Sequence, residues 1–174
     1  MKRALKIEPT HLPDGARLTL ILSLILIIGC RPSLPDDIKF AYQDLPEKID
    51  FNFHIKPILA DRCYKCHGPD DNAREADFRL DIKEKAFAKL KESGDRAFAK
   101  GNIGKSVAWK RITSEDQEFH MPPPESNLSL STKEKALITK WIEQGAEWKE
   151  HWAFIPPEKP SVPDLDNIVT NNPI

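Results

Sequence analysis

Residues 49–70 read IDFNFHIKPILADRCYKCHGPD and contain the motif C-x-x-C-H, formed by Cys63, Cys66 and His67. This motif is typical of covalent c-type haem attachment. Two thiols three positions apart on a helical turn can each form a thioether with one vinyl group of the same porphyrin. The adjacent histidine can then ligate the iron on that face. The pattern therefore predicts one covalently bound haem c, held by Cys63 and Cys66 and ligated by His67.

Other chemistry for the cysteine pair stays open at this point. A zinc site would need a second pair of ligands, and His120 with His151 is a poor substitute for one. A thioredoxin-like redox pair needs a βαβ context, which the sequence pattern lacks. A disulfide between the two neighbours is compatible with an exported protein, but it leaves His67 unexplained. The motif favours haem over all three.

A distal iron ligand is predicted in the segment HMPPP at residues 120–124. Met121 lies there after the mid-chain loops and before the last predicted helix. The proline run stiffens the loop, which limits movement of the sulfur and favours a six-coordinate iron. Core packing is the alternative role for Met121, and His120 is the rival ligand, followed by His54 and His151. Ligation by Met and His would raise the reduction potential relative to two histidines.

The clearest helix is predicted from Thr132 to about Gln144. Ser131 and Glu134 form a capping-box pair at its start, and Gly145 stands at the C′ position. Further short helices are predicted from about Lys56 into the cysteine motif, over residues 82–91 and over residues 106–113. The pattern of the mature chain therefore predicts an all-α fold.

The N-terminus is predicted to be a targeting segment. An apolar run of eleven residues at 18–28 follows a basic leader and is too short for a comfortable transmembrane helix. It ends in IIGC at residues 27–30, which resembles the bacterial lipobox and implies a lipid on Cys30 and cleavage after Gly29. An ordinary signal peptide or a membrane-tethered start is the alternative. Both predict export, and the lipobox predicts a membrane-anchored protein on the periplasmic side.

The charge balance and the positions of the prolines indicate how the rest of the chain is organised. The 174 residues carry 26 Lys and Arg against 27 Asp and Glu, so no single-sign field indicates a nucleic-acid partner. Residues 30–48 are polar and broken by proline, which predicts a tether. The 15 prolines gather mainly at 122–124 and 156–173, and residues 151–174 are therefore predicted to be an extended linker.

The order of helix, C-x-x-C-H, loops, methionine and last helix resembles class I cytochromes c, whose first and last helices cross beside the haem. In more detail, the chain resembles the planctomycete-type cytochrome c domain. The resemblance rests on residues 49–70, 78–86, 111–154 and 162–174. It implies short helices around one covalent haem, with Cys63, Cys66 and His67 binding it and Met121 as the distal ligand. Trp141 would lie in the core where the helices cross.

The resemblance also implies how the chain is divided and what it does. We expect a lipoprotein-type signal peptide over 1–29, the tether over 30–48, the cytochrome c domain over 49–150 and a linker over 151–174. In this family the domain usually opens a longer chain, so the linker would lead toward a downstream domain absent here. The expected function is one-electron transfer by an exported monohaem domain, with an unidentified redox partner or fused domain. A redox subunit of a larger oxidoreductase and a haem-based gas sensor are the alternatives, and no catalytic residue is predicted.

Overall fold

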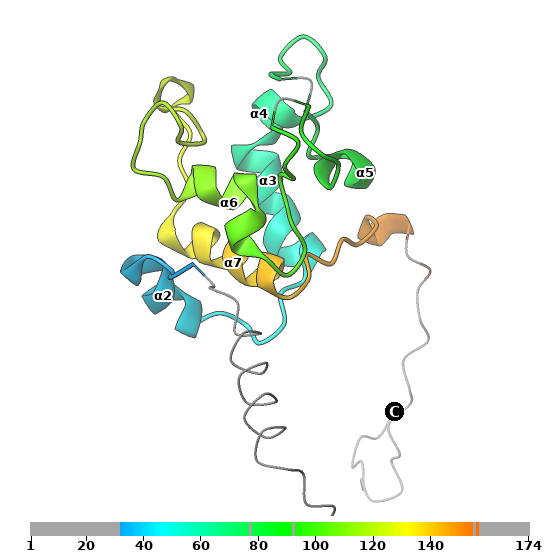
Figure 1. Ribbon diagram of the computed structural model, residues 1–174. Helices are drawn as coiled ribbons and strands as arrows, with labels where there is room; N and C mark the ends of the chain where they lie inside the picture. Colours follow the sequence, from blue (N-terminus) through cyan, green and yellow to red (C-terminus); the bar gives the residue numbers. More distant parts are fainter. Residues whose placement is uncertain (1–31, 77, 92, 155, 157–174) are drawn as a thin grey trace, which may run out of the picture.

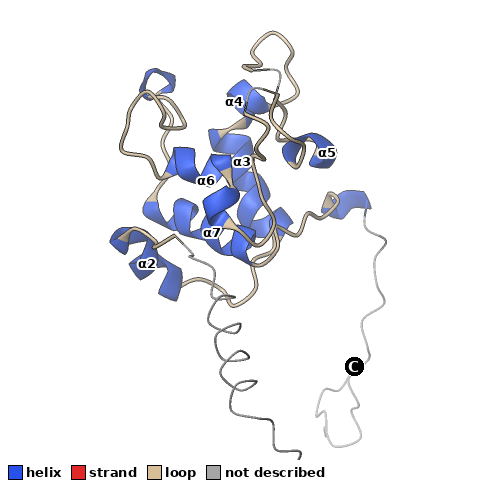
Figure 2. Ribbon diagram, in the orientation of Figure 1, coloured by secondary structure: helices blue, strands red, loops and turns tan. Residues whose placement is uncertain are grey.

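The computed structural model describes residues 32–154 except 77 and 92, together with residue 156. Within these residues the secondary structure is helical, with only two isolated bridges and no strand, as the sequence predicts (Figures 1 and 2). The elements in chain order are α2 (Asp36–Gln43), η1 (Phe51–Ile55), α3 (Lys56–Arg62), α4 (Tyr64–His67), α5 (Lys83–Ala86), η2 (Ile103–Lys105), α6 (Val107–Ile112), η3 (Pro124–Ser126), α7 (Thr132–Glu143) and η4 (Trp152–Phe154). None of the described helices is long and apolar enough to cross a membrane.

Helix α7 is the centre of the packing, because it contacts α2, η1, η2 and α6. Its capping box is formed as predicted: the Ser131 hydroxyl accepts from the Glu134 backbone N–H at 3.2 Å, and the Glu134 carboxylate accepts from the Ser131 backbone N–H at 2.7 Å. Gly145 follows with a φ of 98°, which only glycine adopts without strain. The predicted bounds of this helix are therefore confirmed to within one residue.

Trp141 lies in the core, as expected, with only 1% of its surface exposed. Its ring centroid is 5.8 Å from that of Phe51 on η1 and 5.1 Å from that of Phe98. Trp148, just after α7, also packs against Phe51, with the ring centroids 4.1 Å apart. This aromatic cluster joins the start of the α3 region to the end of α7, and so it holds together segments almost a hundred residues apart.

The segment predicted as a tether differs from the structure. Helix α2 forms within it and packs on α7, with Ile38 1% exposed. The Tyr42 hydroxyl donates to the Glu143 carboxylate at 2.7 Å. The prolines on either side of this eight-residue helix led the sequence analysis to predict a tether. A helix this short is stabilised mainly by its contacts with α7 and not by its own sequence. The boundaries of the signal peptide and of the linker stay predictions.

The other predicted helices match in place but not always in length. α3 begins at Lys56, as expected, but the π-helical turn η1 precedes it and the helix axis breaks at Cys63 before α4. α6 lies within the predicted range 106–113. The helix predicted over 82–91 is only the one turn of α5. It ends early because the Leu90 N–H donates to the Asp95 carbonyl at 2.7 Å, which closes a turn instead of continuing the helix.

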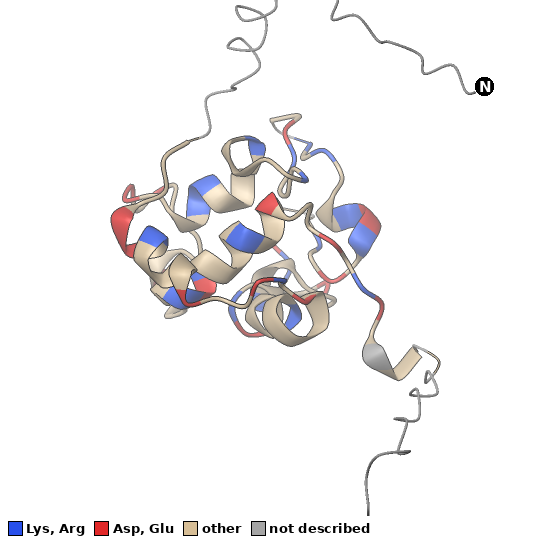
Figure 3. Cartoon of the chain, turned by 90° about the horizontal axis from the view of Figure 1, so that it is seen from below, with Lys and Arg blue, Asp and Glu red and all other residues tan. Residues whose placement is uncertain are grey.

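Basic and acidic side chains are interspersed along the helices in the view of Figure 3. This agrees with the nearly balanced composition of the whole chain. The absence of a nucleic-acid partner stays a prediction.

Asp50 caps η1 and ties it to the segment after α7. Its Oδ1 accepts from the backbone N–H groups of Asn52 and Phe53 at 2.8 and 3.1 Å, and its Oδ2 accepts from Lys149 Nζ at 2.6 Å. Burial by itself would raise the pKa of Asp50. The hydrogen bond from Lys149 and those from the two backbone N–H groups outweigh burial and hold this pKa below its ordinary value.

Because its pKa is lower in the folded state, the stabilisation by Asp50 is present above the unfolded pKa and is lost as the pH falls through the folded pKa. We expect Asp50→Asn to lower the free energy of unfolding at pH 7 by about 1 kcal/mol. It should also flatten the pH dependence of stability below about pH 4. Urea denaturation over a pH series measures both effects. The exposed Asp44→Asn is the control, with a change below about 0.5 kcal/mol, and an unaltered acid limb in Asp50→Asn would contradict the assignment.

Candidate cofactor site

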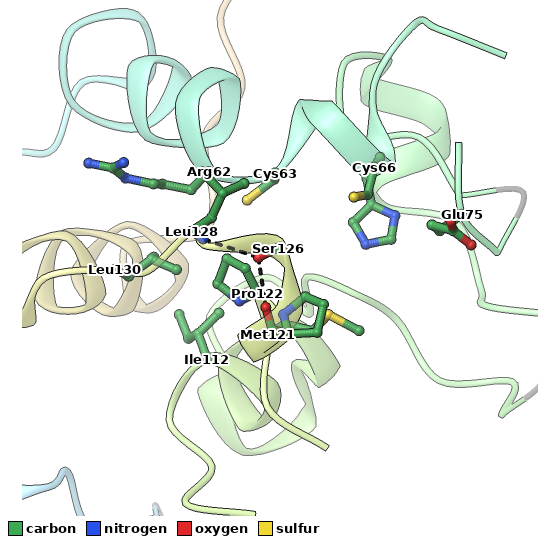
Figure 4. Close-up of a pocket in the computed structure, with 12 residues that line it drawn as sticks. Arg62, Cys63, Cys66, Glu75, Ile112, Met121, Pro122, Ser126, Leu128 and Leu130 are labelled. Atoms are coloured by element: carbon green, nitrogen blue, oxygen red, sulfur yellow. Dashed lines mark hydrogen bonds between the residues drawn. The ribbon is translucent and has the colours of Figure 1, made fainter. Parts of the chain in front are cut away.

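A cavity lies between α4 and the chain that follows α6, and it brings together Cys63, Cys66, His67 and Met121. Figure 4 shows the two cysteines on one wall and Met121 with Pro122 on the wall facing them. The empty volume is about 530 Å³, including space open to solvent.

The cysteine motif is positioned by the break between α3 and α4. Cys63 ends α3, where its N–H donates to the Leu59 carbonyl at 2.9 Å, and its own carbonyl accepts from the His67 N–H at 2.8 Å. All three motif side chains therefore start from a single turn, as the spacing predicts. Gly68 follows, and a Cβ there would lie 2.2 Å from the Tyr64 carbonyl oxygen. Only glycine allows the chain to leave the turn this closely.

The loop after the motif returns to His67 and encloses its ring. The Glu75 N–H donates to the Cys66 carbonyl and the Leu80 N–H donates to the His67 carbonyl, both at 2.8 Å. Phe78 contacts the imidazole edge-on, with centroids 5.3 Å apart. These contacts leave the His67 Nδ1 buried without a hydrogen-bond partner in the described structure. Such an atom is costly in a protein that uses it only for packing, which makes His67 a candidate ligand of a bound group.

The burial of the motif sets the protonation of its side chains. Burial raises the pKa of the Cys63 thiol to about 12, and the negative charge of Glu134 adds to this effect. The thiol is therefore neutral at neutral pH, unlike the thiolate of a zinc or redox-active cysteine. Burial also lowers the pKa of His67, although Glu75 opposes this. A neutral imidazole is the form that ligates a metal.

The distal wall is built by the chain between α6 and α7. The Met121 N–H donates to the Arg111 carbonyl at the end of α6 at 3.2 Å, and Pro122 beside it is buried. Ile112 and Leu130 line the same wall and are also buried. Met121 is thus presented to the cavity from a largely apolar wall.

The other histidines lie elsewhere. The ring Nδ1 of His120 is 2.7 Å from the Ser114 carbonyl oxygen, and His120 does not line the cavity. His54 accepts a hydrogen bond from the Asp50 N–H at 2.8 Å, and His151 accepts one from the Ala153 N–H at 3.1 Å. The structure therefore groups Met121 with the cysteine motif and leaves the three rival histidines outside the cavity. Cys30 lies outside the described residues.

Arg62 and Glu75 also line the cavity, and the sequence interpretation did not include them. Arg62 Nε lies 3.2 Å from Glu134 Oε1, so the capping box of α7 is linked to the residue before Cys63. The sequence could have indicated Arg62, because it directly precedes Cys63 of the motif. Glu75 is brought to the cavity only by the return of the loop, which no sequence spacing indicates.

The geometry gives the alternative cysteine chemistry little support. Cys63 and Cys66 are free thiols, not a disulfide. Among the described residues, no group of three or more His, Cys, Asp or Glu side chains is arranged to hold a metal ion. Two thiols, an imidazole and a thioether facing an apolar cavity are instead the donor set that a haem c requires. The residues present fit this cofactor.

Comparison with known families supports the same conclusion. The sequence model described as Planctomycete cytochrome C matches residues 63–125, a range that includes both the cysteine motif and Met121. This match supports a planctomycete-type cytochrome c domain in this part of the chain. No curated protein and no solved structure matches the chain. The matched part of the cytochrome c domain ends before α7, so this helix is known as part of the unit from its packing alone.

The match to this family indicates haem binding and electron transfer as the class of function. The cytochrome c domain is all-α over the described residues.

Proposed function

We propose that the chain is an exported monohaem cytochrome c with a class I-like arrangement, which accepts and donates single electrons. The main support for the proposal is that one cavity is lined by Cys63, Cys66, His67 and Met121. The order of the helices and the packing of α7 against η1 support the class I-like arrangement. When bound, the haem would supply a one-electron Fe(III)/Fe(II) couple.

Each residue of the cavity has a distinct role in this proposal. Cys63 and Cys66 would hold the porphyrin through thioethers, which do not titrate. His67 would offer a neutral imidazole to the iron, and Met121 would offer its thioether from the facing wall. The apolar residues around Met121 exclude water from the distal side. If His67 and Met121 both ligate the haem iron, the domain would transfer electrons, and catalysis would belong to a partner.

The test is expression of the full chain together with a c-haem maturation system. We expect a red protein that is reduced and reoxidised with one electron per chain, and a haem content of one per chain. Absorption spectra during a redox titration measure both quantities. A colourless exported protein, or one that holds haem only loosely, would overturn the proposal.

Met121→Ala is expected to abolish the sulfur-to-iron charge-transfer band of the oxidised protein, while His120→Ala retains it. The reason is that Met121 lines the cavity and His120 does not. Loss of the thioether should also lower the reduction potential. If the band survives in Met121→Ala, the distal assignment is wrong. Prompt binding of carbon monoxide by the reduced wild-type protein would instead favour the gas sensor.

We further propose that a lipid on Cys30 anchors the exported protein to a membrane. Helix α2 begins at Asp36, so only residues 31–35 separate it from Cys30. Six residue steps span at most about 22 Å, which would keep the cytochrome c domain close to the membrane surface. We expect Cys30→Ala to move the protein from the membrane fraction to the soluble fraction, as measured by fractionation and haem staining. Ser33→Ala is the control, and a soluble wild-type protein would contradict the anchor.

A redox partner completes the proposed function. The partner would be a separate protein or a domain following residue 174, and it would exchange electrons through the solvent-open side of the cavity. This proposal rests on the family resemblance and on the cavity being partly open.

A further inference from the structure

The segment that carries Met121 is held by more than its proline run. It leaves α6 at residue 113 and returns to it, since the Met121 N–H donates to the Arg111 carbonyl at 3.2 Å. Within it, the N–H groups of Phe119 and His120 both donate to the Asp116 carbonyl, at 3.1 and 2.7 Å. The result is a closed loop of nine residues, 113–121, which we call the distal loop.

The His120 side chain crosses the distal loop. Its Nδ1 is 2.7 Å from the carbonyl oxygen of Ser114, at the opposite end of the loop. A carbonyl oxygen can only accept, so Nδ1 carries the hydrogen and donates. His120 is half-buried and immediately precedes Met121. Its side chain therefore connects the residue beside the distal sulfur to the residue just after α6.

The end of α6 is a fixed point for this connection. Trp109 on α6 is 7% exposed, and its Nε1 donates to Thr139 Oγ1 of α7 at 3.0 Å. The Thr113 hydroxyl donates to the Trp109 carbonyl at 2.8 Å, which tightens the last turn of α6. The loop is thus braced against the two helices of the core. The backbone hydrogen bonds to Asp116 and Arg111 and the contact of Arg111 with Phe119 also hold this loop, and the hydrogen bond from His120 adds a side-chain link between its two ends.

We propose that His120 is a positioning residue that holds Met121 in place as the distal ligand. This inference rests on the proposed function, because it presumes a haem with Met121 on its distal side. A ligand on a braced loop loses less conformational entropy when it binds than one on a loose loop. A competing ligand therefore displaces Met121 less easily when His120 is in place. The histidine first considered as the rival ligand serves instead to favour Met121.

Three substitutions separate the hydrogen bond from the bulk of the side chain. His120→Asn introduces an amide nitrogen that can occupy the position of Nδ1 and donate to the Ser114 carbonyl. His120→Gln places its amide nitrogen one bond farther along, near the position of Nε2. His120→Ala removes the donor altogether. The exposed Glu115→Ala is a control within the same loop.

The experiment titrates imidazole into the oxidised, matured full-length variants and follows the sulfur-to-iron charge-transfer band. We expect His120→Ala and His120→Gln to bind imidazole about two- to tenfold more tightly than wild type, the range that one hydrogen bond accounts for. His120→Asn and Glu115→Ala should remain close to wild type. Equal imidazole affinity in all four variants would overturn the role of His120, as would a gain in His120→Asn as large as that in His120→Ala.

Failure of the proposed function gives a different result. If Met121 is not the distal ligand, the band is absent in wild type or persists in Met121→Ala, whatever His120 does. If His120→Ala does not fold, the comparison of His120→Asn with His120→Gln still decides the proposal, because both keep a polar side chain of similar size at this position.

Discussion

Replacing both Cys63 and Cys66 with alanine is expected to abolish covalent haem attachment completely. Among the described residues they are the two thiols that line the cavity, and they start from one helical turn, so their loss removes both bonds to the porphyrin. A haem-stained denaturing gel of protein matured in the presence of the attachment machinery measures the effect directly. Each single replacement should leave one thioether and a weaker stained band.

Lys65→Ala is the matched control for this experiment. Lys65 lies inside the motif but is exposed and does not line the cavity, so its loss should leave the stained band unchanged. A stained band of full intensity in the double variant would show that haem is attached elsewhere. In that case the assignment of the cavity as the cofactor site would be wrong.

The second large effect is expected from Trp141→Ala in the core. The indole is almost fully buried among Phe51, Phe87 and Phe98, and its Nε1 donates to the Glu147 carbonyl at 2.8 Å. Truncating a buried tryptophan typically costs about 3–5 kcal/mol. This is a large part of the roughly 5–15 kcal/mol by which a domain is stable. Urea denaturation of the matured protein, followed by circular dichroism, gives the change in the free energy of unfolding.

Phe53→Ala provides the comparison, because Phe53 is 77% exposed on the neighbouring turn η1. Its replacement should change the free energy of unfolding by less than about 0.5 kcal/mol. A cost below about 1 kcal/mol for Trp141→Ala would mean that the aromatic cluster does not join η1 to α7 in solution. Other contacts would then have to hold η1 and α7 together.

The features that the sequence predicted well depend on neighbours in the chain. The capping box at Ser131 and Glu134 and the start of α3 at Lys56 are local, and the structure has both. Two features that it missed depend on contacts outside the helices themselves. Helix α2 is stabilised by α7, about a hundred residues away, and the one-turn length of α5 follows from the turn that Leu90 and Asp95 close beyond it. Short helices gain most of their stability from packing, which no local pattern reports.

By itself, the sequence determined the chemistry of the proposed site: two thiols and an imidazole within five residues, and a methionine before a run of prolines. These assignments follow from side-chain chemistry and short spacing, which hold in any fold. Only the tertiary structure decided that Met121 and not His120 lines the cavity, because adjacent side chains in a loop point in directions that depend on its closure. It likewise brought Glu75 to the cavity and α2 onto α7, since such contacts arise from the free energy of burying surfaces that lie far apart in the chain.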